Sequence, residues 1–192
     1  SFVHLRTHTE YSVVDGILRV DDAVGAAARD GQVACAITDL SNLFGAIKFY
    51  TAARKKGVKP IIGCDLWLEP ESGEKQGSRL LVLVQNRQGY LNLCELLARA
   101  WSGNTQRSHA FVKWEWFETH GAGLLALSGA DGGAVGQALL TGDVERAEAL
   151  AQRLAALFPQ RFFIEVQRAG LSSNERHVRA AVALASKLQL PV

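Results

Sequence analysis

Methionine is absent from this sequence, cysteine is scarce, and no apolar run is long enough to cross a membrane. The three cysteines, Cys35, Cys64 and Cys94, are odd in number, lie in or beside apolar runs and form no CxxC pair. This pattern argues against a disulfide framework and predicts buried free thiols in a reducing compartment. The N-terminus also lacks the basic-then-apolar layout of a secretory signal. We therefore expect a cytoplasmic protein with no membrane partner.

An excess of one charge sign is also missing. The formal net charge is only +2 over 192 residues, and the basic residues are scattered. A strong nucleic-acid footprint is therefore not indicated, although a modest auxiliary DNA contact remains open. The glycines of "GADGGAVG" (129–136) match neither dinucleotide-binding nor P-loop spacing.

The remaining composition is that of an ordinary globular domain. Hydrophobic residues make up 48% of the chain and charged residues 21%, which is enough for one domain with a sizeable core. Residue 1 is a serine that runs straight into an apolar segment, and "LASKLQLPV" stops where a helix hands over to an apolar strand. We therefore expect one domain over residues 1–192, cut from the N-terminal part of a much longer chain.

Apolar runs rich in β-branched residues alternate with segments of helical period. The runs predict strands at 1–6, 33–39, 59–69, 79–86, 123–129 and 161–167, with a seventh beginning at 190–192. The helical segments are 21–31, 42–56 capped by Ser41, 90–101, 143–158, and 172–188 with Ser172 and Glu175 spaced as a capping box. Surface loops are predicted at 70–78 and 102–109. This order favours a parallel sheet covered by helices, either open or closed into a barrel.

Candidate functional side chains lie where these strands end. Alternation along the first strand puts His4, Arg6 and His8 on one face. The acidic residues near strand ends are Glu10, Asp15, Asp39, Asp65 and Glu165. Histidine and carboxylate ligands suit zinc, manganese or iron, and could activate a water for phosphate-ester hydrolysis. The alternative is that Arg6 is a fixed counter-charge for buried acids, since a permanent cation beside a divalent cation is costly.

Other candidates have simpler interpretations. Ser41 could open a phosphate-binding turn, but a plain helix cap is the expected role. Trp114 and Trp116 are expected to pack in the core, with a partner-docking patch as the alternative. Surface or partly packed positions are expected for the remaining histidines, His109, His120 and His177. Cys35 has no neighbouring base in the sequence and is not expected to be a nucleophile.

Five segments resemble the N-terminal PHP (polymerase and histidinol phosphatase) domain of C-family replicative polymerases, the bacterial DNA polymerase III alpha subunits. They are "HLRTHTEYSVVDG", "AITDLSNLFGAIKFY", "GVKPIIGCDLWLE", "LVLVQNRQGYLNL" and "RFFIEVQRAG", in this order and spacing. The resemblance implies an α/β fold of the distorted (β/α)7 barrel type, truncated before the last strand is complete. Metal-binding members of the family hold ions at the mouth of the barrel. Their ligand pattern is therefore the one to compare with this sequence.

The family's ligand pattern, carried over position by position, is incomplete here. The opening His-x-His appears as Arg6-Thr7-His8, and the aspartate of the next loop is retained as Asp15. Thr-Asp-His appears as Thr38, Asp39 and Leu40, and the glutamate of the third strand as Asp65. A histidine of the fourth strand is replaced by Arg79, and the histidine expected after Glu165 by Ala169. The last Asp-x-His motif would fall beyond Val192.

The resemblance therefore implies a degenerate metal site formed by His8, Asp15, Asp39 and Asp65, with Arg6, Arg79 and Glu165 as ion-pair substitutes. No catalytic residue is expected in this segment. Zn²⁺ or Mn²⁺ would bind only if the PHP site is still functional. The implied role is a scaffold that docks the proofreading exonuclease (epsilon) subunit. The parent chain would synthesise DNA with Mg²⁺ in other domains and contact DNA and the sliding clamp there. The alternatives are an active metal-dependent phosphoesterase or exonuclease, or the PHP domain of an error-prone C-family polymerase.

Overall fold

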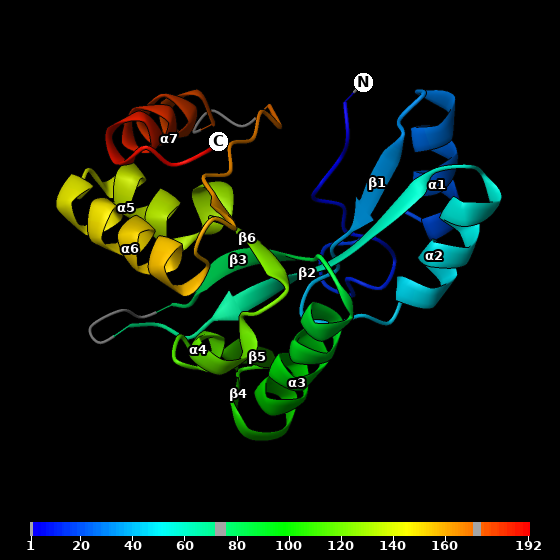
Figure 1. The fold of residues 1–192 in the computed structure, drawn as a ribbon, viewed down its shortest axis with the longest axis horizontal. Helices are drawn as coiled ribbons and strands as arrows, with labels where there is room; N and C mark the ends of the chain where they lie inside the picture. Colours follow the sequence, from blue (N-terminus) through cyan, green and yellow to red (C-terminus); the bar gives the residue numbers. More distant parts are fainter. Residues whose placement is uncertain (1, 72–75, 171–173) are drawn as a thin grey trace. The chain divides into compact units, whose positions relative to one another are not determined.

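The computed structural model describes residues 2–71, 76–170 and 174–192. In these ranges, helices alternate with the strands of a seven-stranded mixed sheet, whose order is β4-β5-β2-β3-β6-β7 with β1 paired to β2 (Figure 1). The chain forms two compact units, residues 1–66 with 81–84, and residues 67–80 with 85–192. The α/β fold expected from the sequence is confirmed.

The first unit contains α1 (Val20–Arg29), β1 (Ala34–Ile37), α2 (Ala46–Lys55) and most of β2 (Lys59–Leu68). β1 pairs in parallel with β2, with Ala34 opposite Lys59 and Ile37 opposite Ile62. Both helices contact β1 and each other (Figure 1). Apolar faces meet between these elements in a core of Val20, Val24, Ala27, Cys35, Ile37, Phe49, Ala53 and Val58.

Two predictions for this unit need correction. The segment 1–6 is not a strand in its described part, although the amide of Ala36 donates to the carbonyl of His4 at 2.9 Å. The second helix begins at Ala46 rather than after Ser41, because Ser41 has a left-handed backbone with φ of 53°. Ser41 is therefore not its N-cap. Gly45 takes that position, where a Cβ would lie 2.8 Å from the side chains of both Ile37 and Tyr11.

The second unit contains most of the helices. Its elements are part of β3 (Ser78–Val84), α3 (Arg87–Gly103), β4 (Thr105–Gln106), β5 (His109–Val112), α4 (Trp116–His120), β6 (Leu124–Leu127), the short 3-10 helix η1 (Ala130–Gly132), α5 (Ala134–Thr141), α6 (Val144–Leu157), β7 (Phe162–Phe163) and α7 (Asn174–Leu188). β5 pairs in parallel with the end of β2, and β6 with β7. α5 packs against both α6 and α7 (Figure 1).

Several helix ends follow the sequence. The side chain of Asn86 accepts from the amide of Gly89 at the start of α3, and Asp143 accepts from Arg146 at the start of α6. These are the expected Asx caps of helix N-termini. The capping box of Ser172 with Glu175 lies partly outside the described residues, as does much of the predicted loop 70–78.

The segment 102–109 was predicted as a loop, but it forms most of a β-hairpin. β4 and β5 pair in antiparallel fashion, with Thr105 opposite Ala110 and Gln106 opposite His109. Arg107 and Ser108 make the two-residue turn, with φ of 48° and 68°. Such turns normally contain Asn or Gly, so the sequence carried no hairpin signal.

Two further strand predictions differ from the structure, and one helix was not predicted. The predicted strand 161–167 is shortened to β7, and residues 190–192 form no strand, although the amide of Ile164 donates to the carbonyl of Pro191 at 2.8 Å. α5 lies within and after the glycine-rich stretch 129–136, which hid it. Gly136 is needed there because a Cβ would lie 1.9 Å from the carbonyl oxygen of Ala130.

The structure also shows where the cysteines, Trp114 and His177 lie. Cys35 and Cys64 are buried free thiols, and Cys94 is half-buried. Trp114 packs in the core at 3% exposure, as expected, with the Arg153 guanidinium 4.4 Å from its ring. His177 is buried at 2% exposure, so its expected surface or partly packed position was wrong. Among the described residues, no helix is long and apolar enough to cross a membrane.

Candidate functional site

The N-terminal segment brings Arg6 and His8 beside the end of β1. Its backbone is tied to β1 by the carbonyl of Thr7, which accepts from Thr38 N at 2.9 Å, and by Thr7 N, which donates to Thr38 Oγ1 at 2.8 Å. In an extended segment, residues two apart lie on the same side, which places Arg6 and His8 together. His4 is not brought to this site, because it is exposed and its ring packs edge-on against Phe2.

Asp65, in the middle of β2, is the buried centre of the site. Its side chain is 0% exposed, and its Oδ2 accepts from Arg6 Nη1 and lies 3.1 Å from His8 Nε2. The other ring nitrogen of His8, Nδ1, lies 2.9 Å from Asp15 Oδ1. We call these four residues, Arg6, His8, Asp15 and Asp65, the Asp65 cluster. In it, one guanidinium and one imidazole face two carboxylates.

The protonation of His8 follows from these neighbours. Burial by itself lowers the pKa of His8, but the hydrogen bond and negative charge of Asp65, followed by those of Asp15, outweigh it and leave the pKa above its ordinary value. A protonated ring has two N–H groups and can donate to both carboxylates at once. The cluster therefore favours cationic His8 as a bridge between Asp15 and Asp65.

Asp39 lies just after β1 and is buried under a set of hydroxyl groups. Its carboxylate accepts from Thr9 N at 2.6 Å, from Thr9 Oγ1 at 2.8 and 3.0 Å, and from Ser12 Oγ at 2.9 Å. Ser12 Oγ in turn accepts from the amide of Leu40 at 2.9 Å. These bonds hold the loop that follows the N-terminal segment against the end of β1. Thr9 and Ser12 are site residues that the sequence analysis missed, since short hydroxyl side chains in a loop carry no specific signal.

Arg79 and Glu165 belong to the second unit. The Arg79 guanidinium lies 4.7 Å from the ring of Trp67, in a cation–π contact. Glu165 is buried at 7% exposure, with one oxygen accepting from Gly129 N at 3.1 Å and the other from Gln167 Nε2 at 2.8 Å. Their role as ion-pair substitutes at the former metal site stays a prediction. The contact of Arg79 with Trp67 was not foreseen.

The potential metal ligands do not fit a metal ion well. The part of the chain that the structure describes contains no group of three or more His, Cys, Asp or Glu residues arranged to hold one. His8 and a guanidinium already occupy Asp65 Oδ2, and backbone and hydroxyl donors occupy Asp39. A divalent cation at Asp65 would also lie close to the permanent charge of Arg6, which opposes binding. These occupied carboxylates and the neighbouring guanidinium therefore disfavour a divalent ion at Asp65.

Nucleophilic catalysis by a thiol has no support in the site. Burial raises the pKa of the Cys35 thiol, and burial followed by the negative charge of Asp65 raises that of Cys64. A thiol with a raised pKa carries little thiolate at neutral pH and is a poor nucleophile. This agrees with the expectation for Cys35.

The chain is similar to members of one protein family over most of its length. The model of the PHP domain family matches residues 4–169. The chain is 44% identical over 192 residues to the DNA polymerase III subunit alpha of Pseudomonas aeruginosa, covering 100% of this chain and 16% of that protein. It is 39% identical to the same subunit of Neisseria meningitidis serogroup A and 37% identical to that of Escherichia coli K12, covering 17% and 16% of those proteins and 100% of this chain.

Two solved structures share the fold at low sequence identity. One is assigned as a metal-dependent phosphoesterase from Bifidobacterium adolescentis, with a TM-score of 0.61 and 13% identity over 98% of this chain and 83% of that one. The other is an amidohydrolase from Chromobacterium violaceum with bound sulfate and no metal, with a TM-score of 0.63 and 16% identity over 99% of this chain and 84% of that one. The fold, the family match from His4 onward and the relatives' identity over the full chain agree, and the chain belongs to the PHP domain family.

Proposed function

We propose that this chain is the PHP domain of a DNA polymerase III alpha subunit and that it acts as a structural scaffold. The chain spans only 16–17% of the length of the polymerase relatives, so DNA synthesis would be carried out by other domains, with their own Mg²⁺ ions. The observation that carries the scaffold role is the contact of Arg6 with the fully buried Asp65. It supplies internally the positive charge that a metal ion would otherwise supply.

The replacement has a clear physical basis. A buried carboxylate must be paired or protonated, because leaving a charge in a low-dielectric interior costs several kcal/mol. Arg6 and His8 together provide that pairing at Asp65, and Thr9 and Ser12 provide hydrogen bonds at Asp39. The site is thereby stable without an ion. Hydrolysis of a phosphate ester would need an activated water, for which these occupied carboxylates leave little room.

Elemental analysis tests this proposal. The purified protein is dialysed, and zinc, manganese and iron are measured per mole of protein, beside the variant Arg6→His/Leu40→His. We expect well below one equivalent of metal in the natural protein and a clear increase in the variant, which regains two imidazoles. A variant with two histidines at exposed positions elsewhere, Leu91→His/Val182→His, controls for non-specific binding. One or more tightly held equivalents in the natural protein would contradict the scaffold proposal.

A second candidate is an active metal-dependent phosphoesterase. The observation that favours it is that His8 still joins Asp15 and Asp65, so part of a ligand set is assembled. It predicts retained metal together with metal-dependent hydrolysis of a generic phosphomonoester such as p-nitrophenyl phosphate. If this candidate is right, the His8→Ala variant must lose that hydrolysis. A PHP domain of an error-prone polymerase remains the other alternative, and the test is whether the gene is essential for growth.

Docking of the proofreading exonuclease subunit is the second part of the proposal. A protein-docking surface needs exposed apolar side chains, and the first unit has five strongly exposed ones in two short segments, three at 13–17 and two at 44–47. Val13, Val14 and Ile17 are 84–97% exposed, and Phe44 and Ile47 are 73 and 76% exposed. Their two segments are joined by a hydrogen bond from Asn42 Nδ2 to the carbonyl of Tyr11 at 2.9 Å. We call these five residues the apolar surface of the first unit.

A binding assay with the purified exonuclease subunit tests the docking role. Val14→Asp/Ile17→Asp should weaken association by about tenfold or more, because each charge would have to be desolvated in the contact. Val144→Asp, at a 51% exposed position in the second unit, is the control and should bind as the natural protein does. Unchanged binding of the double variant would exclude this surface. No association with a folded natural protein would count against docking altogether.

A further inference from the structure

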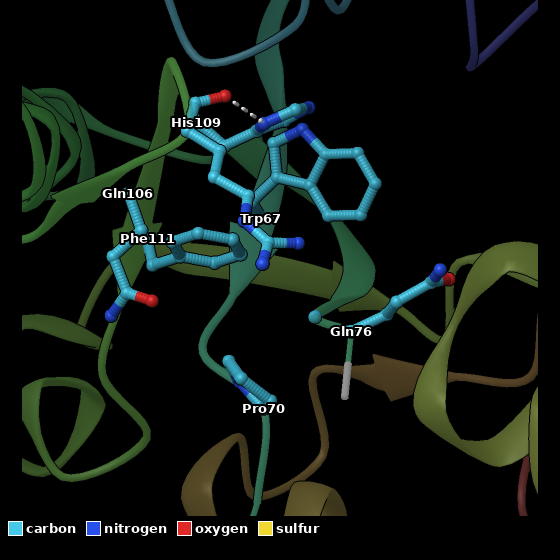
Figure 2. Close-up of a pocket in the computed structure, with 8 residues that line it drawn as sticks. Trp67, Pro70, Gln76, Gln106, His109 and Phe111 are labelled. Carbon is cyan, nitrogen blue, oxygen red and sulfur yellow. Dashed lines mark hydrogen bonds between the residues drawn. The ribbon is translucent and has the colours of Figure 1, made fainter. Parts of the chain in front are cut away.

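A pocket of about 500 Å³ lies in the second unit and shares no lining residue with the Asp65 cluster. One wall comes from the end of β2 and from residues at the two ends of the β2–β3 connection. The other wall comes from the β4–β5 hairpin (Figure 2). Its lining residues are Trp67, Pro70, Gln76, Gly77, Gln106, Arg107, His109 and Phe111. The family resemblance assigned no role to any of these side chains.

Three aromatic rings are fixed against one another in this pocket. The ring centroids of Trp67 and His109 are 5.0 Å apart at 89°, and those of Trp67 and Phe111 are 6.2 Å apart at 61°. The guanidinium of Arg79 lies over the Trp67 ring at 4.7 Å. Gly77 allows Phe111 its place, since a Cβ there would lie 2.4 Å from Phe111 Cε1. The aromatic wall is therefore already formed and offers flat surfaces to a planar ligand.

The polar side chains that the structure describes in the pocket lining are cationic or neutral. Arg107 is a cation, Gln76 and Gln106 carry neutral carboxamides, and none of these described lining residues is Asp or Glu. A carboxamide can both donate and accept, as the edge of a nucleobase requires, and a guanidinium suits a phosphate. With a cation and no carboxylate among these described residues, the lining favours an anionic ligand over a cationic one. A planar group joined to an anion matches this lining.

The position of Arg107 has an energetic cost that supports a role in binding. Arg107 and Ser108 both have left-handed backbones, a conformation that is unfavourable for side chains other than Gly, Asn or Asp. The Nδ1–H of His109 donates to the carbonyl of Arg107 at 3.0 Å and helps to hold the turn. Strained residues of this kind concentrate at ligand sites. Here the strain keeps a cation at the rim of an aromatic pocket.

We propose that this pocket binds a nucleotide, with its base against the aromatic wall of Trp67, His109 and Phe111 and its phosphate on Arg107. Stacking of bases on aromatic side chains beside a cation is the usual mode of binding to unpaired strands and tolerates different bases. The nucleotide can come from a single DNA strand or from a free nucleotide, since both present the same chemistry. This inference does not rest on the scaffold role, and the metal content of the protein does not test it.

Photo-crosslinking on the full-length protein tests the proposal with a site-specific readout. One probe is a single-stranded oligonucleotide with one 5-iodouracil, which reacts on irradiation with nearby aromatic side chains, and the other is 5-iodo-dUMP. Labelled peptides are identified by mass spectrometry. We expect labelling on peptides that contain Trp67, His109 or Phe111. Labelling by both probes would mean that a single nucleotide suffices, and labelling by the oligonucleotide alone would identify a strand as the source.

Two glycine variants separate the guanidinium from the turn. Arg107→Gly and Ser108→Gly each relieve a left-handed residue, but only the first removes the cation. At subsaturating probe, Arg107→Gly should lower labelling of the pocket about tenfold, as expected for loss of a charge-assisted bond, while Ser108→Gly should retain it. Absence of pocket labelling while other peptides of the same protein react would overturn the proposal. Equal labelling in Arg107→Gly would overturn it as well.

Discussion

At the scale of single residues, Arg6 and Asp65 form the ion pair at the centre of the Asp65 cluster. The Asp65 side chain is fully buried, whereas Arg6 is 22% exposed, so the pair is intermediate between a surface and a buried ion pair. Removing one partner of a buried pair is more costly than the pair itself is stabilising, because the other charge remains in the interior. His8 would compensate for part of that loss at Asp65.

Arg6→Met should therefore lower the free energy of unfolding by about 2 kcal/mol, less than the 3–5 kcal/mol typical of a fully buried pair. Adding Asp65→Asn should restore part of this stability, since it removes the unpaired charge. Urea unfolding of the 192-residue chain measures both effects. Lys48→Met, which breaks a more exposed pair with Glu10, is the control and should have a much smaller effect. A loss in Arg6→Met no larger than in this control would contradict the assignment of Asp65 as the buried centre.

His177 gives the second prediction at this scale. Burial lowers the pKa of His177, and the charges of Asp131 and Glu165, which raise it, only partly offset the shift. In the unfolded chain the imidazole takes up a proton near pH 6.5, the ordinary pKa of histidine, while the folded chain resists protonation until lower pH. Stability associated with His177 should be complete above that pH and should be lost as pH falls through the folded pKa.

Urea unfolding at about pH 7.5 and pH 5 tests this assignment. The stability of His177→Gln should fall less between the two pH values than that of the natural protein. His4→Gln removes an exposed imidazole and serves as the control. An equal fall in His177→Gln and the natural protein would show that His177 does not carry this dependence.

At the scale of elements, α3 is fixed by a contact between two backbones. Gly89 lies in its first turns, and a Cβ there would lie 1.9 Å from the carbonyl oxygen of Gly123. Gly103 ends the same helix, and a Cβ there would meet no atom within 4 Å. The two glycines thus occupy opposite environments in one helix.

Helix propensity alone predicts that Gly89→Ala stabilises α3 by about 1 kcal/mol. The structure predicts the reverse, a loss of about 2 kcal/mol, because backbone atoms must move to admit the methyl group. Gly103→Ala is the matched control and should not lower stability. Thermal unfolding of both variants measures the difference. A stabilised Gly89→Ala would show that α3 does not approach Gly123 this closely.

Element prediction from the sequence succeeded where local signals and burial agreed, and failed where they did not. α3 and α6 have caps and an apolar stripe, and both were predicted within a few residues. The β4–β5 hairpin was missed because its turn, Arg107-Ser108, contains neither Asn nor Gly. The second helix was started too early, since Ser41 has the residue type of a cap but a left-handed backbone. That conformation depends on neighbours distant in sequence, such as Asp65, whose carbonyl accepts from Ser41 N.

The candidate site could be predicted in part. Period-two alternation placed Arg6 beside His8, and positions near strand ends pointed to Asp15 and Asp65, which the structure brings to His8. Asp39, found by the same rule, accepts from Thr9 and Ser12. The sequence could not show that the Thr9 and Ser12 hydroxyls occupy Asp39, because hydroxyl side chains are common in loops and their partners lie far along the chain. Nor could it show the stacking of Arg79 on Trp67, which depends on side-chain directions in two different strands.

At the scale of the whole molecule, the boundary between the two compact units falls inside strands. β2 crosses it between Leu66 and Trp67, and β3 crosses it between Leu80 and Leu81. A strand cannot lose half its length without exposing backbone groups, so opening one unit should disturb the other. We therefore expect the 192-residue chain to unfold in one cooperative transition.

The distribution of tryptophan makes this testable. The four tryptophans, at positions 67, 101, 114 and 116, all lie in the second unit, so their fluorescence follows that unit alone. Far-ultraviolet circular dichroism follows the helices of both units. The two midpoints of urea unfolding should coincide. Separate midpoints would mean that the units unfold independently despite the strands they share.

The pairing of Arg6 with Asp65 determines where the positive charge beside Asp65 comes from. A bound ion must be acquired from the surroundings after synthesis, can be exchanged for another ion, and is removed by a chelator. A guanidinium is made with the chain itself, one per molecule, and remains charged throughout the physiological pH range. The positive partner of Asp65 is therefore encoded in the gene, and its supply does not depend on how much metal the cell contains.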